Sequence, residues 1–170
     1  NRKSGGGVID RFRGRLMIPL RDVHGNVIAF TGRILQSPAP ADAPKYMNSP
    51  ETLLYKKGEI LYGLDLAKQA IRQQDTVIIV EGNLDVVASH KANVKNVVAS
   101  SGTALTEMQI RLLKRFTNNL LFCFDADAAG FAAAQRGVHL AQSLGAEVAV
   151  VLIPKDAGKD PDDVVQKDPS

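Results

Sequence analysis

The 170-residue sequence contains one cysteine, no tryptophan and no long apolar run. A lone cysteine, Cys123 within the segment LLFCF, can build neither a disulfide framework nor a cysteine zinc site, so we assign it a packing role. No segment reaches the roughly 20 apolar residues that a membrane-spanning helix requires. The opening NRKSGGGVIDRF also lacks the apolar centre of a signal peptide. We therefore expect a cytoplasmic protein without a membrane partner.

The sequence also lacks an initiating methionine and any Ser/His/Asp or Cys/His arrangement that would suggest nucleophilic catalysis. It begins at Asn1 and stops at KDPS, just after an acidic motif. We therefore expect a piece of a longer polypeptide whose chemistry does not depend on a side-chain nucleophile.

Positive and negative charges are unevenly distributed, although the net charge is only +3. Residues 1–75 contain 12 Lys and Arg against 7 Asp and Glu, whereas residues 76–170 contain 9 against 11. A basic part suits a polyanionic partner, and an acidic part suits divalent cations. An uneven solvated surface explains the same counts equally well.

Residues 1–75 have the pattern of a small α+β unit. The β-rich segments 15–20 and 27–35 flank the turn residues Gly25-Asn26 and predict a hairpin. Ser49-Pro50-Glu51 predicts the start of a helix, with serine as its cap. Apolar residues recur with helical spacing over residues 64–73, which predicts an amphipathic helix.

Residues 76–170 alternate between short apolar strands and helices. The expected strands cover residues 76–80, 96–100, 119–124 and 147–153. Thr106 and Gln109 form a capping box before one helix, and Gly145 closes another. This alternation predicts an α/β domain with a mostly parallel sheet and helices on both faces. We expect this domain at 76–170, preceded by the smaller α+β subdomain at 1–75.

Acidic residues follow three of the expected strands. They are Glu81 after the first, Asp125 and Asp127 after the third, and Asp160, Asp162 and Asp163 after the fourth and a short loop. Because parallel strands end at one edge of a sheet, these carboxylates should meet there. Oxygen ligands without His or Cys favour Mg²⁺ or Mn²⁺. Taken singly, each motif is more commonly a helix cap or a solvated turn.

The same residues carry a family resemblance. IVEGNLDVV, FCFDADAAG and GKDPDDVV resemble the Glu, DxD and terminal acidic motifs of Toprim domains, which bacterial primases, topoisomerases and some nucleases share. Upstream, RFRGRLMIPLRDVHGNVIAFTGRIL and PKYMNSPETLLYKKGEILYGLDLAK resemble the N-terminal RNA-polymerase subdomain of bacterial DnaG-type primases. The resemblance covers nearly all of residues 9–167, and PKYMNSPET is its most specific part.

The resemblance implies metal-dependent synthesis of short RNA primers on a single-stranded DNA template from ribonucleoside triphosphates. It places the metals on Asp125, Asp127, Asp160 and Asp162, with Glu81 as acid/base or further ligand. Two positions depart from the family pattern: Asn83 replaces an aromatic residue and Ala126 replaces a glycine. Neither change removes a ligand, although alanine resists backbone angles that glycine adopts freely.

Basic and aromatic residues of the first part are candidates for binding template or nucleotide by the same resemblance. They are Arg33, Lys45, Tyr46, Asn48 and Lys57. Cations interleaved with an aromatic ring suit single-stranded DNA, where phosphates carry charge and bases stack. The alternative is a solvated face with Tyr46 in the core. For the segment Ser100–Thr103, a phosphate-facing loop and a simple strand-to-helix turn are equally consistent with the sequence.

Two rival functions remain at this stage. One is a Toprim nuclease or topoisomerase fragment, disfavoured because all three tyrosines (Tyr46, Tyr55 and Tyr62) precede residue 76. The other is a non-catalytic nucleic-acid-binding module whose acids only cap helices. For the whole protein, the resemblance implies work at the bacterial nucleoid and replisome. It also implies contact with the replicative helicase through a C-terminal domain outside this sequence.

Overall fold

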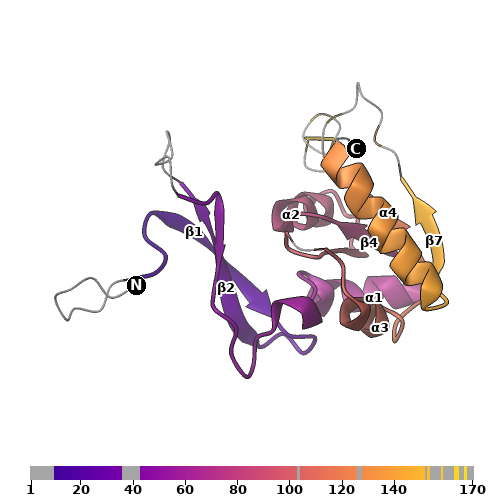
Figure 1. The fold of residues 1–170 in the computed structure, drawn as a ribbon, viewed down its shortest axis with the longest axis horizontal. Helices are drawn as coiled ribbons and strands as arrows, with labels where there is room; N and C mark the ends of the chain where they lie inside the picture. Colours follow the sequence, from indigo (N-terminus) through magenta and orange to yellow (C-terminus); the bar gives the residue numbers. More distant parts are fainter. Residues whose placement is uncertain are drawn as a thin grey trace.

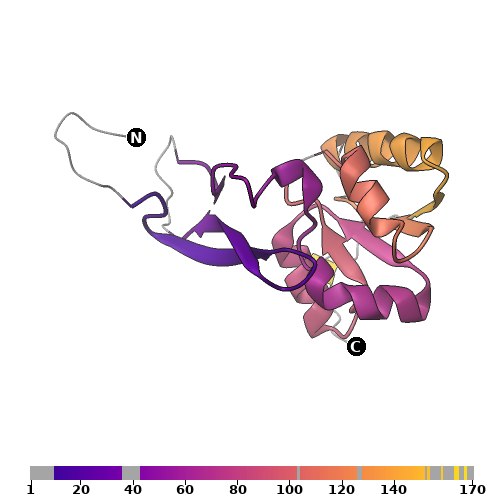
Figure 2. The same ribbon diagram turned by 90° about the horizontal axis from the view of Figure 1, so that it is seen from below.

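A computed structural model describes residues 10–35, 43–102, 104–125, 128–151, 153, 158, 163–164 and 167. The described chain forms two units side by side along the long axis of the molecule (Figures 1 and 2). An antiparallel sheet lies at one end, and an α/β unit with a parallel sheet lies at the other. Within the described residues, no helix is long and apolar enough to cross a membrane.

The antiparallel sheet contains β1 (Arg15–Arg21), β2 (Val27–Ile34) and β3 (Tyr46–Asn48) in that order. The hairpin between β1 and β2 is confirmed, with Leu16 opposite Arg33 in the register. The Asp22 carboxylate closes the turn by accepting hydrogen bonds from the backbone N–H groups of His24 and Asn26, both at 2.9 Å. Gly25 adopts a φ of 96°, which a turn of this kind requires of glycine.

The predicted helix start at Ser49-Pro50-Glu51 is wrong, because residues 49–56 contain no helix. The N–H of Ser49 donates to the carbonyl of Phe30 at 2.8 Å, and the Ser49 hydroxyl accepts from the N–H of Phe30 at 3.0 Å. Ser49 therefore extends the pairing of β3 with β2. Its side-chain oxygen is used by the sheet, so it caps no helix.

The chain then enters the α/β unit through η1 (Lys57–Glu59) and α1 (Leu64–Gln74). The predicted amphipathic helix is confirmed, because Leu64, Ala67 and Ile71 are buried on one side of α1. These side chains pack in the same core as the strand residues Val77 and Ile79. Packing therefore crosses the division that the sequence predicts between 1–75 and 76–170, and that division stays a prediction.

The parallel sheet has the strand order β5-β4-β6-β7. These strands are β4 (Val77–Val80), β5 (Val97–Ala99), β6 (Asn119–Phe122) and β7 (Glu147–Val150), each shorter than the sequence predicted. Every pairing among them is parallel. The capping box of Thr106 and Gln109 is confirmed at the start of α3 (Glu107–Leu113). Gly145, with a φ of 72°, follows α4 (Ala128–Ser143).

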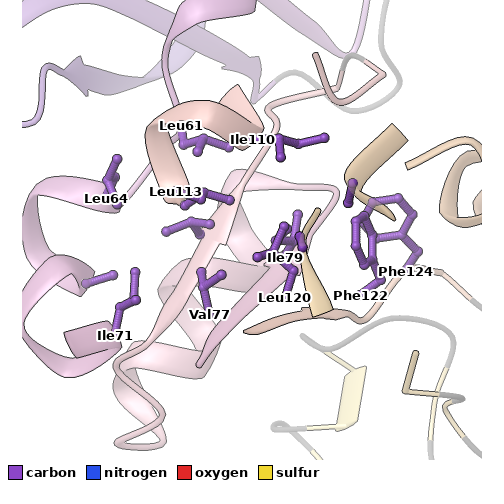
Figure 3. Packing of buried hydrophobic residues seen from close by; sticks show 14 of the residues in the cluster. Leu61, Leu64, Ile71, Val77, Ile79, Ile110, Leu113, Leu120, Phe122 and Phe124 are labelled. Carbon is purple, nitrogen blue, oxygen red and sulfur yellow. The ribbon is translucent and has the colours of Figure 1, made fainter. Parts of the chain in front are cut away.

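Helices cover both faces of this sheet, as the sequence predicted. One face packs against α1, α3 and α4, and Figure 3 shows Leu61, Leu64 and Ile71 together with Ile110, Leu113 and the strand residues of this core. The alternate strand residues Val80, Val97 and Ala99 pack on the other face with Val86 of α2 (Asn83–Lys91). Burial on both faces holds the sheet rigid, which fixes the loops at its carboxyl edge.

Candidate active site

A pocket of about 380 Å³ lies where the antiparallel sheet meets the carboxyl edge of the parallel sheet. It is lined by all five predicted binding residues (Arg33, Lys45, Tyr46, Asn48 and Lys57) and by the predicted acids Glu81 and Asp125. Residues separated by almost a hundred positions in sequence therefore share one cavity. It is the principal candidate for the functional site.

Neighbouring strands bring two of the predicted acids, Glu81 and Asp125, together. β4 pairs with β6 so that Ile79 lies opposite Phe122, and Glu81 and Asp125 follow these strands. The Oε1 atom of Glu81 accepts a hydrogen bond from the N–H of Asp125 at 3.4 Å. Both residues line the pocket, and carboxylate oxygens are the donor type that Mg²⁺ and Mn²⁺ prefer.

Gly130 lets helix α4 begin close against these acids. A Cβ atom at this position would clash with the carbonyl oxygen of Asp125 and would lie 2.9 Å from Oε1 of Glu81. Real Cβ atoms do not approach other atoms so closely. A glycine is therefore required where α4 meets the acidic edge.

Residues at the start of α2 also line the pocket. The buried Asp85 accepts a hydrogen bond from the N–H of Gly82 at 2.9 Å through its Oδ2 atom, which fixes the turn after Glu81. Asn83, also buried, accepts a hydrogen bond at 2.7 Å from the hydroxyl of Ser101. Ser101 and Gly102 follow β5 with positive φ angles of 61° and 72°. This sharp turn places the loop between β5 and α3 against the pocket.

Cys123 lies near the acids but on the opposite side of the sheet from α4. It packs beside Val80 and Val86, which agrees with the packing role predicted for it. Burial raises the pKa of its thiol to about 11, and the negative charges of Asp85 and Asp125 add to this shift. The thiol is therefore protonated at neutral pH, which disfavours a role as a nucleophile.

The opposite wall of the pocket is one face of the antiparallel sheet. Arg33 and Tyr46 are direct partners across β2 and β3, as are Thr31 and Asn48. The Arg33 guanidinium carbon and the Lys45 Nζ lie 5.9 and 6.0 Å from the centre of the Tyr46 ring. Tyr46 has 38% of its surface exposed to solvent, so it is not a core residue. Two cations thus flank an accessible aromatic ring.

Three predicted acids are not described by the structure, and the pocket residue Thr31 was not predicted. Asp127, Asp160 and Asp162 lie outside the described residues, and among the described residues no three His, Cys, Asp or Glu side chains form a metal-binding group. Thr31 lines the pocket but was not predicted. The two-residue period of a strand, which places Thr31 on the same face as Arg33, was the signal that could have found it.

Family models match both parts of the chain. A model described as Toprim-like matches residues 78–165, and a model described as DNA primase catalytic core, N-terminal domain, matches residues 1–68. The parallel sheet and the acids at its carboxyl edge thus define a Toprim-like α/β protein. Together with the N-terminal match, this shows that the chain belongs to the bacterial DnaG-type DNA primases, as part of their catalytic core.

Individual relatives cover nearly the whole chain. A DNA primase of Synechococcus elongatus is 44% identical over 170 residues, which are 98% of this chain and 24% of the relative. The crystal structure of the zinc-binding and RNA polymerase domains of the Aquifex aeolicus primase matches with a TM-score of 0.90 and 38% identity, over 99% of this chain and 41% of that one. A DnaG primase catalytic domain bound to single-stranded DNA matches with a TM-score of 0.81 and 42% identity, over 94% and 49%. The chain spans about a quarter of the length of the curated relatives it matches.

Proposed function

We propose that this chain forms the nucleotidyl-transfer site of a DNA-directed RNA polymerase that makes short RNA primers on single-stranded DNA. The observation that carries the proposal is the shared pocket. It joins Glu81 and Asp125 on one wall to Arg33, Lys45 and Tyr46 on the other. Acids that can hold cations therefore face groups that can hold phosphates and bases.

The metal in this proposal is Mg²⁺ or Mn²⁺, held by Glu81, Asp125, Asp127, Asp160 and Asp162. Glu81 and Asp125 fit such an ion because both present carboxylate oxygens to the same pocket. A bound divalent ion would stabilise negative charge on the attacking and leaving oxygens.

The chain's own residues bind and orient the reactants. Arg33, Lys45 and Lys57 bind phosphate groups of the template or of the incoming ribonucleotide, and the exposed face of Tyr46 stacks on a base. Asn48, across the ladder from Thr31, supplies a neutral polar contact. The DnaG catalytic domain that matches this chain with single-stranded DNA bound supports the choice of template.

Glu81 is the proposed proton acceptor. The primer's 3′-hydroxyl attacks the α-phosphate of the ribonucleotide, its proton passes to Glu81, and pyrophosphate leaves. The position of Glu81 directly after the central strand β4 and its hydrogen bond from the N–H of Asp125 hold the carboxylate in place. Such fixed geometry is what general base catalysis requires.

The test is incorporation of labelled ribonucleotides on single-stranded DNA by the full-length protein, with and without Mn²⁺. We expect metal-dependent synthesis, and we expect Glu81→Gln to reduce it on the order of 10²-fold, as is typical for a catalytic acid/base. Nucleotide binding should weaken far less. Synthesis by the variant within a few-fold of the parent would refute the role of Glu81.

The same reaction mixtures address the rival functions. A topoisomerase or nuclease would cleave or relax DNA without incorporating ribonucleotides, and a binding module would do neither. Tyr46 is the one tyrosine that lines the pocket, and it lies on the antiparallel sheet rather than in the Toprim-like part. Primer synthesis is therefore the function that the site favours.

For the whole protein we propose cytoplasmic action at the replisome, with contact to the replicative helicase through a domain outside this chain. The length of the relatives supports this proposal, because this chain spans only 24% of the Synechococcus elongatus primase. A pull-down of helicase by the full-length protein, compared with this chain alone, would test where that contact lies.

A further inference from the structure

Gln109 is a fully buried polar residue that the proposed reaction does not use. It lies in the first turn of α3 with 0% of its surface exposed. Its Oε1 atom accepts a hydrogen bond from the N–H of Thr106 at 3.0 Å, which completes the capping box. A capping glutamine usually remains near solvent, so its complete burial calls for a second role.

The amide nitrogen of Gln109 binds the segment that carries Lys57. It donates to the carbonyl of Ile60 at 2.6 Å and lies 3.4 Å from the carbonyl of Lys57. The hydroxyl of Thr106 donates to the carbonyl of Gly58 at 2.5 Å. One turn of α3 thus holds three backbone carbonyls of η1 and its flank, about fifty positions away in sequence.

Tyr55 and Leu61, on either side of η1, are buried, but η1 itself has few other contacts. η1 spans three residues, has no side-chain cap and contains no buried residue. A helix this short is not stable by its own hydrogen bonds. Two further contacts of η1 join exposed groups: the N–H of Lys57 donates to Glu51 at 2.9 Å, and Lys56 pairs with Glu59 at 3.1 Å. The hydrogen bonds from α3 are therefore the partly buried polar contacts of η1.

Lys57 belongs to η1 and lines the pocket. The loop of Ser101 and Gly102, which precedes α3, lines the same pocket. The start of α3 therefore contacts η1 on one side of the pocket and is joined through the chain to the loop on the other. A displaced η1 would move the Lys57 cation relative to Glu81, although neither side chain had changed.

We propose that Gln109, with Thr106, is a positioning residue that sets Lys57 for phosphate binding. The proposal rests on the proposed function, in which Lys57 contacts a phosphate. Gln109 itself touches neither substrate nor metal, and it acts through the backbone carbonyls of residues 57, 58 and 60.

The test uses the full-length protein and a single-stranded oligonucleotide at several salt concentrations. Gln109→Met is neutral and similar in size, so it removes the amide without changing charge. We expect it to reduce the log–log salt slope of binding by about 0.7, the value of one lost phosphate contact. Lys57→Ala should cause the same loss, and the double variant should lose no more than either single variant.

A kinetic split separates positioning from a loss of folded protein. Displacing Lys57 should raise KM for template and leave kcat within about twofold of the parent, whereas partial unfolding lowers apparent kcat and leaves KM unchanged. Thr106→Val, which removes the hydroxyl but keeps the shape, should repeat the effect if Gln109→Met does not fold. Thr106→Ser, which keeps the hydroxyl, should restore the parent slope.

The outcomes distinguish this inference from the proposed function. If Lys57→Ala leaves the slope unchanged, Lys57 binds no template phosphate, and both its role in template binding and this inference fall. If Lys57→Ala flattens the slope but Gln109→Met and Thr106→Val do not, only this inference falls. A double variant that loses about 1.4 would also overturn it, because the residues would then act independently.

Discussion

At the scale of single residues, the site depends on close approach as much as on charge. Gly130 illustrates this, because the space beside its Cα is occupied by the Asp125 carbonyl and the Glu81 carboxylate. Asp85 and Asn83 are buried, and their side chains accept hydrogen bonds from the N–H of Gly82 and the hydroxyl of Ser101, respectively. The acidic edge is therefore shaped by these buried groups as well as by Glu81 and Asp125.

Gly130→Ala should damage the site more than the fold. Overpacking of this kind costs roughly 1–3 kcal/mol, partly offset by the about 1 kcal/mol that alanine gains over glycine in a helix. Because the new methyl group displaces Glu81 or Asp125, we expect primer synthesis and Mn²⁺ binding to fall together.

Gly137→Ala is the matched control for this change. It lies on the same helix, and its Cβ would meet the ring of Phe122 at 2.6 Å in the core, away from the acids. It should lower the melting temperature and leave Mn²⁺ affinity unchanged in calorimetric titration. Equal Mn²⁺ affinity for both variants would contradict the close-approach argument.

At the scale of elements, β2, β3 and η1 form one wall of the pocket and supply it with cations and an aromatic ring. Lys45, which directly precedes β3, and Lys57 of η1 contribute cations. Tyr46 contributes a ring with 38% of its surface exposed. The cation–ring distances of 5.9 and 6.0 Å lie at the outer limit of cation–π attraction, so both cations are near the ring. Each element thus supplies a different kind of contact to a nucleic acid.

Removing Lys45 and Lys57 together should flatten the salt dependence of single-stranded DNA binding. Each phosphate contact on a single strand contributes about 0.7 to the log–log slope, so the double alanine variant should lose about 1.4. Tyr46→Ala should cost roughly 1–3 kcal/mol with its slope nearly unchanged, because stacking releases no counterions. Fluorescence anisotropy at several salt concentrations measures both quantities.

Lys56→Ala provides the control, since Lys56 is adjacent to Lys57 but exposed and paired with Glu59 at 3.1 Å. Its slope should match that of the parent. If the slopes of the parent and the Lys45/Lys57 double variant were equal, this face would be a solvated surface only.

At the scale of the whole molecule, two units meet at one pocket. The parallel sheet supplies the acids and the antiparallel sheet supplies the cations, while α1 packs into the same core as β4. Each unit alone has half of a site. Metal binding should stabilise the folded α/β unit, which carries all the proposed ligands, by mass action.

Mn²⁺ should raise the melting temperature of the parent and should raise that of Asp125→Asn much less. At a free concentration 100 times the dissociation constant, bound metal adds about 2.7 kcal/mol to the free energy of unfolding. Without metal, Asp125→Asn should be at least as stable as the parent, because it removes one charge from a crowded acidic edge. Thermal unfolding with and without Mn²⁺ measures both effects.

Glu147→Gln is the control for this experiment, because Glu147 is an exposed carboxylate at the start of β7, where the strand enters the sheet. It should keep the full response to Mn²⁺. An equal response from Asp125→Asn would exclude Asp125 as a ligand.

The sequence by itself determined the elements of the α/β unit and the edge where function gathers. Strands buried on both faces must be almost wholly apolar, so the first charged residues after them, Glu81 and Asp125, mark the carboxyl edge without any structure. Capping chemistry is equally local, which is why Thr106 with Gln109 and the glycine at 145 were predicted correctly.

Only the tertiary structure decided which residues distant in sequence contact one another. The local pattern at Ser49 favours a helix cap, but pairing with Phe30, nineteen positions away, satisfies its backbone and its hydroxyl in a sheet. Likewise, Gln109 caps its own helix and also binds the segment of Lys57, a partner that local sequence does not specify. Local propensities act over a few residues, whereas buried hydrogen bonds between distant segments arise only when packing brings their partners together.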